Sequence, residues 1–581
     1  MISYKECFSD NEMIKFFCKK RIKLAKKRNR KHLLLNFTWN TKFNYHCQEC
    51  KDENENILSS ILPSRRSWIK LGKDRRYKDG QLVDSATKNY TSLLFTVRKA
   101  LNDKKTEKWL SELTKLVGTI RKEVFTLTYR IKAPITFPKI KDDKDKTSII
   151  CRPISVFNLQ DSLVITQTNK YLTQFFDSSM LDYAFAFRAS RCNEEGKLKA
   201  IRHHDAFQKI IDYRSKHSDE DIYVAECDMK KFFDTVNHKV VVRQFFSFIL
   251  RKFISTGKFP SIFAVKVFLN YLKSYSFYRC VFSLNETQEH FNKHGIENGK
   301  YEWIKKAELK QHYKENQIEG NCIGIPQGGA LSGLIANIVL DYADRQIKRI
   351  DDANLLYLRY CDDMIIMHTD KNKCQKAFDV YFNSLKKLKL YPHEPVQYDS
   401  NDAKEFWKSK TKKPYLWDKS ANYWITFVGY DIAKNGDIRV RKKSLEKEMN
   451  KQKDVINEIL RVVSQKGNRA SNSRIIESAK NRLIGMSVGR FTLRNYNSSI
   501  QSMCWANGFK LLNDNKTSRY QLKMLDRSRN KEIARLIRIL RVKNIDKNKN
   551  TTTKASNRQL IYYGKPFSYY YAIIEKQGEN K

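Results

Sequence analysis

Two adjacent aspartates, Asp362 and Asp363, lie at the centre of an otherwise apolar stretch, residues 354–368. β-Forming residues flank the pair, including Tyr357 before it and Ile365 after it, which predicts a strand, a tight turn and a returning strand. Neighbouring carboxylates repel each other, and a pair of divalent cations would relieve that repulsion. Taken alone, however, the pair is explained better by a surface turn with two solvated carboxylates.

A third acid comes from residues 222–234. Residues 222–225 predict a short apolar strand, and Asp228 lies just past its end, where sheets of α/β proteins present catalytic groups. The alternative is that an aspartate here caps the helix that follows. That alternative fits Asp234 as well as a functional role does, and it fits Asp228 less well.

Residues 324–340 begin with proline and glycine turn signals and continue as an apolar helix. Gly328 and Gly329 would let the backbone approach a ligand closely, because glycine has no Cβ. Gln327 directly precedes them. Taken alone, this segment is better explained as a glycine-rich turn before a core helix.

Together and in this order, the three segments resemble motifs A, B and C of the reverse transcriptase palm. Four more segments resemble two fingers motifs of bacterial reverse transcriptases, motif E (the primer grip) and the thumb entry, at residues 151–161, 183–188, 427–431 and 438–445. The resemblance covers roughly residues 130–510. Within it, a polar insertion is expected at about 283–319, and motif D, near 388–396, is only weakly recognisable.

The resemblance implies an α+β right-hand polymerase with fingers, palm and thumb. The palm β-sheet is expected to be backed by helices, the thumb to be helical, and both ends of the chain to carry extensions. The expected parts are a basic N-terminal extension with the start of the fingers, the fingers, the palm with fingers elements and the insertion, the thumb, and a basic C-terminal helix with an aromatic tail, at residues 1–130, 131–220, 221–435, 436–520 and 521–581.

For the catalytic centre, the resemblance implies that Asp228 and Asp362 bridge two Mg²⁺ ions and that Asp363 supports the site. The Met229 backbone carbonyl would add an oxygen ligand. Such a site suits Mg²⁺, which prefers oxygen ligands, and Mn²⁺ is an acceptable substitute.

For nucleotide binding, the resemblance implies that Arg152 grips the triphosphate and that Gln327 contacts the nucleotide or the template. Phe233 would be a steric gate that favours dNTPs, with core packing of the Phe as the alternative. Lys139 and Lys141 are candidate phosphate ligands, as are Lys144 and Lys146 just after them. A solvated charged turn explains these lysines equally well.

Two positions depart from the family pattern. Cys361 stands in the catalytic turn where alanine or another small residue is common, and it is small enough to be tolerated. Gly333 stands where many relatives have proline, which is expected to loosen the start of that helix. Neither change removes a metal ligand, so an active enzyme is expected.

The 581 residues include 111 Lys and Arg against 63 Asp and Glu, which gives a formal net charge of +48. This excess predicts salt-dependent binding to nucleic acid. An anionic membrane is the competing partner, but no apolar run approaches ~18 residues and no signal-peptide pattern is present, so no membrane association is expected. The 12 cysteines are mostly isolated, as in proteins of the reducing bacterial cytoplasm.

Basic side chains are expected to contact nucleic acid in an N-terminal helix, at the thumb entry and in a C-terminal amphipathic helix. The candidates are Lys19, Lys20, Arg21, Lys26, Lys27, Arg28, Arg439, Arg441, Arg527 and Arg535. Apolar residues at helical spacing from Leu445 to Val463 predict the first thumb helix. The aromatic cluster between Tyr562 and Tyr571 predicts a β-hairpin docked on the thumb; base stacking or a priming tyrosine hydroxyl is the alternative.

The expected activity is RNA-directed DNA synthesis from dNTPs, with an RNA template, a dedicated noncoding RNA as one candidate for it, and a DNA product. By exclusion of retron and group II intron features, the chain looks most like the stand-alone abortive-infection or defence-associated enzymes of bacteria, which implies antiphage defence in the cytoplasm. Group II intron- or retron-type enzymes, a template-independent or protein-primed DNA polymerase, and a non-enzymatic RNA-binding maturase or scaffold remain alternatives. A homo-oligomer and a second protein subunit also stay open.

Overall fold

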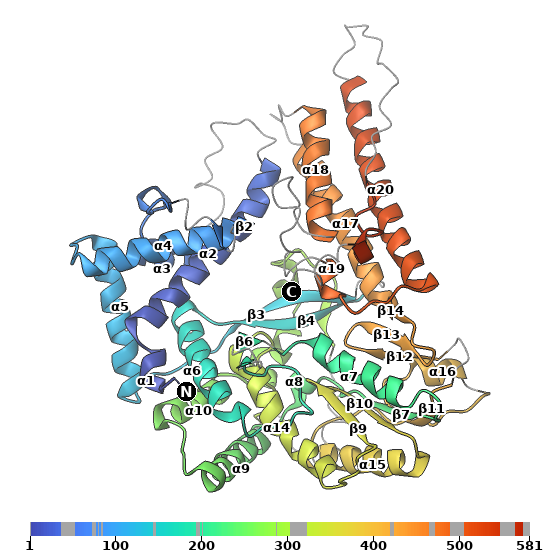
Figure 1. Ribbon diagram of the computed structural model, residues 1–581. Helices are drawn as coiled ribbons and strands as arrows, with labels where there is room; N and C mark the ends of the chain where they lie inside the picture. Colours follow the sequence, from blue (N-terminus) through green and yellow to red (C-terminus); the bar gives the residue numbers. More distant parts are fainter. Residues whose placement is uncertain are drawn as a thin grey trace. The chain divides into compact units, whose positions relative to one another are not determined.

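The computed structural model of the chain (Figure 1) describes residues 2–35, 53–72, 77–78, 81–82, 85–142, 147–192, 198–199, 201–285, 287–302, 322–401, 403–418, 423–463, 471–487, 505–545 and 564–572. Of these, residues 26–35, 77–78, 81–82, 85–86, 142, 191–192, 198–199, 462 and 542–545 are described by their backbone alone. No helix within the described ranges combines the length and the apolar character needed to cross a membrane.

The chain forms two compact units. The first contains Met1–Phe17, Ile57–Leu62 and Ala100–Asp418, and the second contains Cys18–Asn56, Pro63–Lys99 and Lys419–Lys581. All the predicted catalytic and nucleotide-binding residues belong to the first unit. The predicted primer grip and thumb belong to the second.

A four-stranded antiparallel sheet is the centre of the first unit. Its order is β11-β7-β10-β9, with bounds Lys412–Leu416, Tyr223–Cys227, Asp363–His368 and Leu356–Tyr360. Five consecutive residues of β10, from Met364 to His368, are buried, as expected for a strand with both faces covered. This is the sheet that carries the predicted acids.

Helix α15 (Lys371–Lys387) covers this sheet by packing against β10, β7 and β11, and Figure 1 shows it beside the sheet. The Asp370 carboxylate begins the helix by accepting the N–H groups of Asn372 and Lys373. Buried residues then recur at helical spacing and face the strands: Cys374, Ala377, Phe378, Tyr381 and Leu385. Helix α14 (Ala330–Lys348) packs against α15 and also against α6 and α9.

A second sheet forms the predicted fingers hairpin. Strands β3 (Ile135–Asp142) and β4 (Ile149–Val156) pair antiparallel, and β8 (Gly299–Tyr301) adds to β4 in parallel, with Tyr301 beside Cys151. The segment expected to be a polar insertion therefore begins as part of the fingers. Its apolar residues Phe291, Ile296 and Tyr301 join a buried core that also contains Cys151, Tyr275, Phe277 and Val281. Residues 303–321, the rest of that segment, lie outside the described ranges.

The remaining elements of the first unit surround these two sheets. They are α1 (Tyr4–Cys7), α5 (Lys108–Phe125), β5 (Arg191–Cys192), α6 (Leu159–Asp177), β6 (Leu198–Lys199), α7 (His203–Lys216), α8 (Phe232–Thr235), α9 (His238–Thr256), α10 (Ile262–Ser274), α11 (Phe277–Cys280), η2 (Phe282–Asn285), α12 (Glu289–Asn292) and α16 (Ala403–Lys408). Helices α2 (Asp10–Leu35) and α3 (Glu53–Ile61) run from one unit into the other, as does α4 (Ser85–Asn102).

The second unit contains a three-stranded sheet, β12 (Trp424–Phe427), β13 (Tyr430–Ala433) and β14 (Ile438–Val440), followed by helices. These are α17 (Lys442–Val463), α18 (Asn472–Ser487), α19 (Trp505–Gly508) and α20 (Lys516–Ile545). Helices α17, α18 and α20 share a core of Ile456, Ile459, Ile475, Ala479, Leu483, Ile533, Leu536, Ile537 and Leu540. The unit also holds η1 (Arg65–Ser67), β1 (Tyr77–Lys78) and β2 (Gln81–Leu82).

The described part of the C-terminal tail, residues 564–572, is a turn followed by the start of a helix, so the predicted β-hairpin is wrong for these residues. Both carboxylate oxygens of Asp526 on α20 accept backbone N–H groups, from Phe567 at 2.9 Å and from Ser568 at 2.8 Å. Phe567 and Tyr570 are buried, whereas Tyr569 is 50% exposed. The tail therefore does dock on the thumb helices, as predicted. Tyr562 and Tyr563 lie outside the described residues.

Candidate active site

The first predicted acid, Asp228, directly follows β7, which runs antiparallel to β10. The register pairs Cys227 with Met364, so continuing it by one residue sets Asp228 opposite Asp363. The Asp228 backbone is fixed by the Thr411 hydroxyl, which accepts the Asp228 N–H at 3.2 Å and donates to the Asp228 carbonyl at 3.3 Å. The sheet register therefore brings the predicted acids to one end of the palm sheet.

Asp362 lies in a two-residue hairpin turn and Asp363 begins the returning strand β10, because Tyr360 pairs with Asp363 and leaves Cys361 and Asp362 between the strands. Cys361 has a φ of 60°, the left-handed conformation that tight hairpin turns require at this position. A residue with a Cβ pays about 1 kcal/mol or more for that conformation. Cys361 is buried, Asp362 is half-buried and Asp363 is exposed. The predicted strand, turn and strand are all present.

The carboxylates of Asp228 and Asp362 affect each other. Burial raises the pKa of Asp362, and the charge of Asp228 raises it further, whereas Arg152 lowers it. Asp228 Oδ2 lies 3.2 Å from Lys410 Nζ and 3.7 Å from His393 Nε2. Burial and the Lys410 charge lower the pKa of His393, which keeps its ring neutral near pH 7. A cation beside the two carboxylates would stabilise both in the charged form.

The donor atoms decide whether these residues suit a divalent metal ion. Among the residues that the structure describes, no three His, Cys, Asp or Glu side chains converge as a metal-binding group. Asp228 and Asp362 nevertheless offer carboxylate oxygens, which Mg²⁺ prefers, and their repulsion favours a cation between them. Met229, the predicted carbonyl ligand, is buried and forms an isolated β-bridge with Pro392. The residues present therefore fit a divalent ion chemically.

Of the two phenylalanines after Asp228, only Phe233 presents surface. Phe232 is 2% exposed, whereas Phe233 is half-buried, and their rings meet edge-on with centroids 5.4 Å apart. The Phe233 carbonyl accepts the Ile325 N–H at 2.7 Å, which ties this segment to the one that carries Gln327. The ring predicted to be the steric gate is therefore not a core residue in the way that Phe232 is.

Gln327 connects two parts of the site. Its Nε2 donates to Asp234 Oδ1 at 2.8 Å, and its carbonyl accepts the Ser155 N–H of β4 at 2.8 Å. Asp234 is 2% exposed, and burial raises its pKa to about 6 although Gln327 and nearby cations lower it. The expectation that Asp234 caps the following helix is wrong, because the Asn237 side chain caps α9 instead.

The fingers hairpin supplies cations to the same site. Arg152 on β4 pairs with Lys139 on β3, both are exposed, and Lys141 follows on β3. The Arg152 charge lowers the pKa of Asp362 and, with Lys141, that of Asp234, so both cations lie near these acids. Lys144 and Lys146 lie outside the described residues.

A family model described as "Reverse transcriptase (RNA-dependent DNA polymerase)" matches residues 143–394, a span that holds the three predicted acids together with Arg152, Phe233 and Gln327. The chain contains a reverse transcriptase domain. The protein is an RNA-directed DNA polymerase, a nucleotidyltransferase, and the predicted α+β right-hand polymerase fold is confirmed. The prediction of a bacterial defence-type enzyme is confirmed only as far as this domain.

Solved structures with detectable similarity include the apo telomerase of Candida tropicalis, with 13% identity and a TM-score of 0.34 over 93% of this chain and 87% of that chain. Another is the telomerase of Candida albicans in complex with a TWJ fragment of telomeric RNA, with 10% identity and a TM-score of 0.28 over 90% of this chain and 81% of that one. No curated protein matches the sequence.

The predicted catalytic turn is supported by a fully buried arginine, Arg359. Arg359 Nη1 donates to the Cys361 carbonyl at 3.0 Å, and Nη2 forms an ion pair with Asp344 Oδ2 at 2.6 Å. Tyr357 donates to Asp344 Oδ1 at 2.7 Å, and Arg359 Nη1 also donates to Asn337 Oδ1 at 3.2 Å. Arg359 precedes Tyr360 in the catalytic segment, yet its sequence position alone did not indicate this role.

The glycines of the motif B segment fit close contacts in the reverse transcriptase. A Cβ on Gly329 would lie 1.9 Å from the Tyr271 hydroxyl, and a Cβ on Gly333 would lie 2.4 Å from the Phe187 ring. Gly333 is buried within the regular helix α14. The departure at Gly333 therefore accommodates an aromatic ring from the fingers segment, and the helix is not interrupted there.

Four charged or titratable side chains near the catalytic acids were not predicted from the sequence: Lys231, Glu302, His393 and Lys410. Glu302 Oε2 lies 2.9 Å from Lys141 Nζ and 2.8 Å from Lys231 Nζ. His393 belongs to the weakly recognisable motif D segment, and its N–H donates to the Asp228 carbonyl at 3.0 Å. A histidine directly after a strand-like bridge at Pro392 gives little sequence signal, so geometry alone reveals it.

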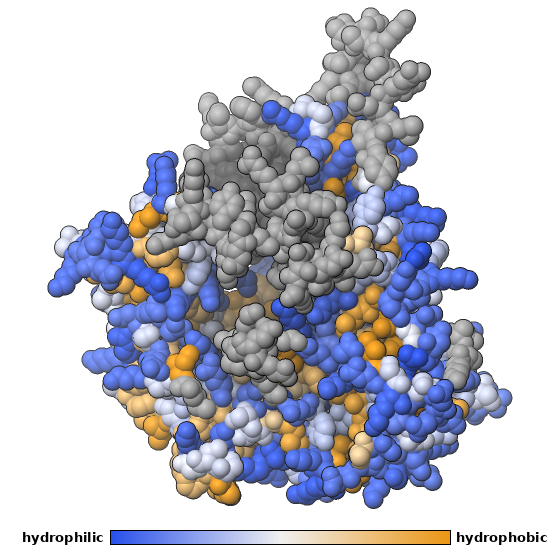
Figure 2. All heavy atoms as spheres, in the orientation of Figure 1, coloured by the Kyte–Doolittle hydropathy of each residue, from blue (hydrophilic) through white to orange (hydrophobic). Residues whose placement is uncertain are grey.

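The predicted N-terminal basic helix is present as α2. Lys19 is exposed, with its Nζ 5.9 Å from the centre of the Tyr90 ring, and burial lowers the pKa of Lys20. Arg21 is half-buried. The side chains of Lys26, Lys27 and Arg28 lie outside the described residues. Hydrophilic residues dominate the coloured part of the face drawn in Figure 2.

The predicted basic residues of the second unit divide into two groups. Arg439 pairs with Asp431 at 3.0 Å and stacks 4.0 Å from the Trp424 ring, and Arg535 pairs with Glu532. These two therefore hold the thumb together. Arg441 and Arg527 are exposed and remain candidates for contact with nucleic acid.

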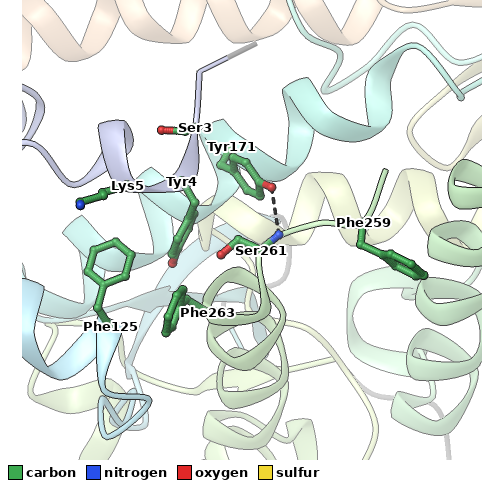
Figure 3. Close-up of a pocket in the computed structure, with 8 residues that line it drawn as sticks. All are labelled: Ser3, Tyr4, Lys5, Phe125, Tyr171, Phe259, Ser261 and Phe263. Carbon is green, nitrogen blue, oxygen red and sulfur yellow. Dashed lines mark hydrogen bonds between the residues drawn. The ribbon is translucent and has the colours of Figure 1, made fainter. Parts of the chain in front are cut away.

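A shallow pocket elsewhere in the first unit contains none of the catalytic segments (Figure 3). Aromatic side chains dominate its lining, and the Tyr171 hydroxyl accepts the Ser261 N–H at 2.9 Å across it. The lining residues are Ser3, Tyr4, Lys5, Phe125, Tyr171, Phe259, Ser261 and Phe263. It offers no carboxylate or histidine, so it lacks the groups that the polymerase reaction requires.

Proposed function

We propose that the enzyme extends a primer with dNTPs by two-metal nucleotidyl transfer, with Mg²⁺ held by Asp228 and Asp362. The observation that carries the proposal is the sheet register, which sets Asp228 opposite Asp363 and beside the turn that holds Asp362. Burial and the Asp228 charge raise the pKa of Asp362, in agreement with that arrangement. Asp363 would support them, and the Met229 carbonyl would add an oxygen ligand. Bound divalent ions, Mg²⁺ or Mn²⁺, would stabilise charge developing on the primer oxygen and the triphosphate.

The chain's own residues would bind and orient the nucleotide. The planar Arg152 guanidinium matches phosphate oxygens, and Lys139 and Lys141 add positive charge from the same hairpin. Phe233 would occupy the space that a ribose 2′-hydroxyl needs. Gln327, fixed by its hydrogen bonds to neighbouring segments, would contact the nucleotide or the template.

The direct test is incorporation of labelled dNTPs or rNTPs by the purified protein with its co-purified nucleic acid and Mg²⁺. Incorporation of dNTPs is expected, and sequencing the product would identify the template or reveal template-independent synthesis. Failure to incorporate any nucleotide, with added primer–templates as well, would contradict the proposal. Incorporation of rNTPs in preference to dNTPs would contradict it too.

Replacing Phe233 with Val should reduce discrimination against rNTPs by roughly tenfold to a hundredfold, because a smaller side chain leaves room for the 2′-hydroxyl. The ratio of kcat/KM for dNTP and rNTP measures this effect. Phe233→Tyr is the matched control, because it keeps the ring and should keep the discrimination. An unchanged ratio in Phe233→Val would show that the ring is not a gate.

The biological role that we propose is antiphage defence in the bacterial cytoplasm, with a dedicated noncoding RNA as template. Support comes from the net charge of +48 and from the extensions on both sides of the matched domain, including the basic helix α2. Such segments would suit a specific RNA partner better than a general primer–template.

Cells that carry the gene with its native flanking sequence should therefore resist some phages of a broad panel. The measurement is plaque formation relative to cells with an empty vector. Cells that carry the Asp362→Asn variant, which retains the RNA-binding surfaces, are the matched control and should be sensitive. Equal plaque formation by every phage on all three strains would contradict a defence role.

A further inference from the structure

The fingers sheet contains a third strand, β8, which does not belong to the β3–β4 hairpin. Strand β8 comes from the segment after η2 and pairs in parallel with β4, so that Tyr301 lies beside Cys151 and both side chains are buried. Successive side chains of a strand point to opposite faces. Glu302 follows Tyr301, and Arg152 follows Cys151. The side chains of Glu302 and Arg152 therefore point to the opposite face of the sheet, where Arg152 is exposed.

On that face Glu302 forms ion pairs with two lysines. Glu302 Oε2 lies 2.9 Å from Lys141 Nζ of β3 and 2.8 Å from Lys231 Nζ of the catalytic Asp228 segment. The two lysines lower the pKa of Glu302 to about 2, so its carboxylate stays charged throughout the physiological range. One carboxylate oxygen thus bridges a fingers cation and a palm cation.

The bridged lysines belong to the two segments that we propose to bind the nucleotide, since Lys141 is on β3 of the fingers hairpin and Lys231 lies between Asp228 and Phe233. Lys231, Arg152 and Lys141 each lower the pKa of Asp234, the buried partner of Gln327, and Arg152 also lowers that of Asp362. Lys231 itself has a left-handed backbone, with φ 51°, directly before α8. Three cations therefore act on Asp234, and the Glu302 carboxylate, 2.9 Å from Lys141 Nζ and 2.8 Å from Lys231 Nζ, neutralises part of their charge.

We propose that Glu302 is a tethered anion that occupies the triphosphate-binding lysines, so that an incoming dNTP must displace it from Lys141 and Lys231. Lys231 is then an additional triphosphate contact, and Glu302 sets the KM for nucleotide. This inference rests on the proposed polymerase reaction, and it concerns a residue that the segment after η2 contributes to the domain.

The charges and exposures make this exchange favourable. Glu302 is 43% exposed, and Lys141 and Lys231 are 37% and 21% exposed, so their ion pairs are partly screened by solvent and individually weak. A triphosphate carries several negative charges and can contact both lysines and Arg152 at once. The nucleotide therefore outcompetes one carboxylate, but it binds more weakly than it would to uncompensated lysines.

The experiment measures equilibrium binding of dTTP and of inorganic tripolyphosphate to the full-length protein without primer, together with the KM for dTTP in primer extension. Glu302→Gln should bind both ligands about three- to tenfold more tightly and lower the KM by a similar factor. Glu297→Gln, an exposed acid-to-amide change in the same segment, is the matched control and should bind like the wild type. Added salt should reduce the difference.

A double-mutant cycle separates competition for the lysines from a general change in charge. In a Lys141→Met/Lys231→Met background, dTTP should bind more weakly than to the wild type, and adding Glu302→Gln should no longer tighten it. Equal or weaker binding by Glu302→Gln, or equal tightening by Glu297→Gln, would overturn the inference. Absence of dNTP incorporation by the wild type would contradict the proposed function instead, whereas normal incorporation with unchanged dTTP affinity in Glu302→Gln would contradict this inference alone.

Discussion

Replacing Asp362 with Asn should lower DNA synthesis by about 10³-fold or more, because the variant keeps the shape of the side chain and loses a metal-binding charge. The measurement is primer extension under single-turnover conditions. Asp212→Asn, an exposed acid-to-amide change on α7, is the control and should leave synthesis unchanged. Residual synthesis within tenfold of the wild type would contradict a catalytic role for Asp362.

The same variant should not be less stable than the wild type. Burial and Asp228 raise the pKa of Asp362 in the folded protein, so its charged form opposes folding. That penalty is absent below the pKa of the unfolded side chain and develops as the pH rises through the folded pKa. In thermal unfolding, the stability of Asp362→Asn relative to the wild type should therefore increase as the pH rises from about 4 to 8. That result would show that the variant loses synthesis because it lacks the catalytic carboxylate and not because it unfolds.

Replacing Arg359 with Met should destabilise the first unit by about 3–5 kcal/mol, because it leaves the Asp344 carboxylate buried without its partner. It should also lower kcat, because the Cys361 carbonyl loses the hydrogen bond that holds the catalytic turn. Denaturant unfolding and single-turnover extension measure the two effects separately.

A compensated variant distinguishes positioning of the turn from general stability. Arg359→Met combined with Asp344→Leu and Tyr357→Phe removes the buried ion pair and the tyrosine hydroxyl bound to it, and it should recover much of the lost stability. The Cys361 carbonyl would still lack its donor, so kcat should remain low while the KM for nucleotide changes little. Recovery of kcat along with stability would mean that Arg359 acts only by holding the fold.

Much of the palm could be predicted because its signals are local. Neighbouring residues alone were enough to predict three of its features. These are the apolar strands on both sides of Asp362, the strand before Asp228 and the apolar helix after Gly329. The thumb helix between Leu445 and Val463 was predicted from its spacing for the same reason and is present as α17.

Other features depend on partners far away in the sequence. Strand β8 has three residues and pairs with β4, so no periodicity marks it, and the segment was interpreted as a polar insertion. Tyrosines near the C-terminus suggested a strand, but the Asp526 carboxylate instead fixes a turn by accepting two backbone N–H groups. Lys231, Glu302 and His393 become candidates only when three segments meet at Asp228.

The order of strands in the palm also constrains how the enzyme folds as it is synthesised. Strand β7 pairs with β10 on one side and β11 on the other, and both partners come later in the chain. The ribosome therefore releases β7 with two open edges, and its apolar residues lack both partner strands until residues up to Leu416 have been synthesised. A chain that stops before β11 would leave this central strand open to intermolecular pairing, so shortened proteins from interrupted translation are prone to aggregate.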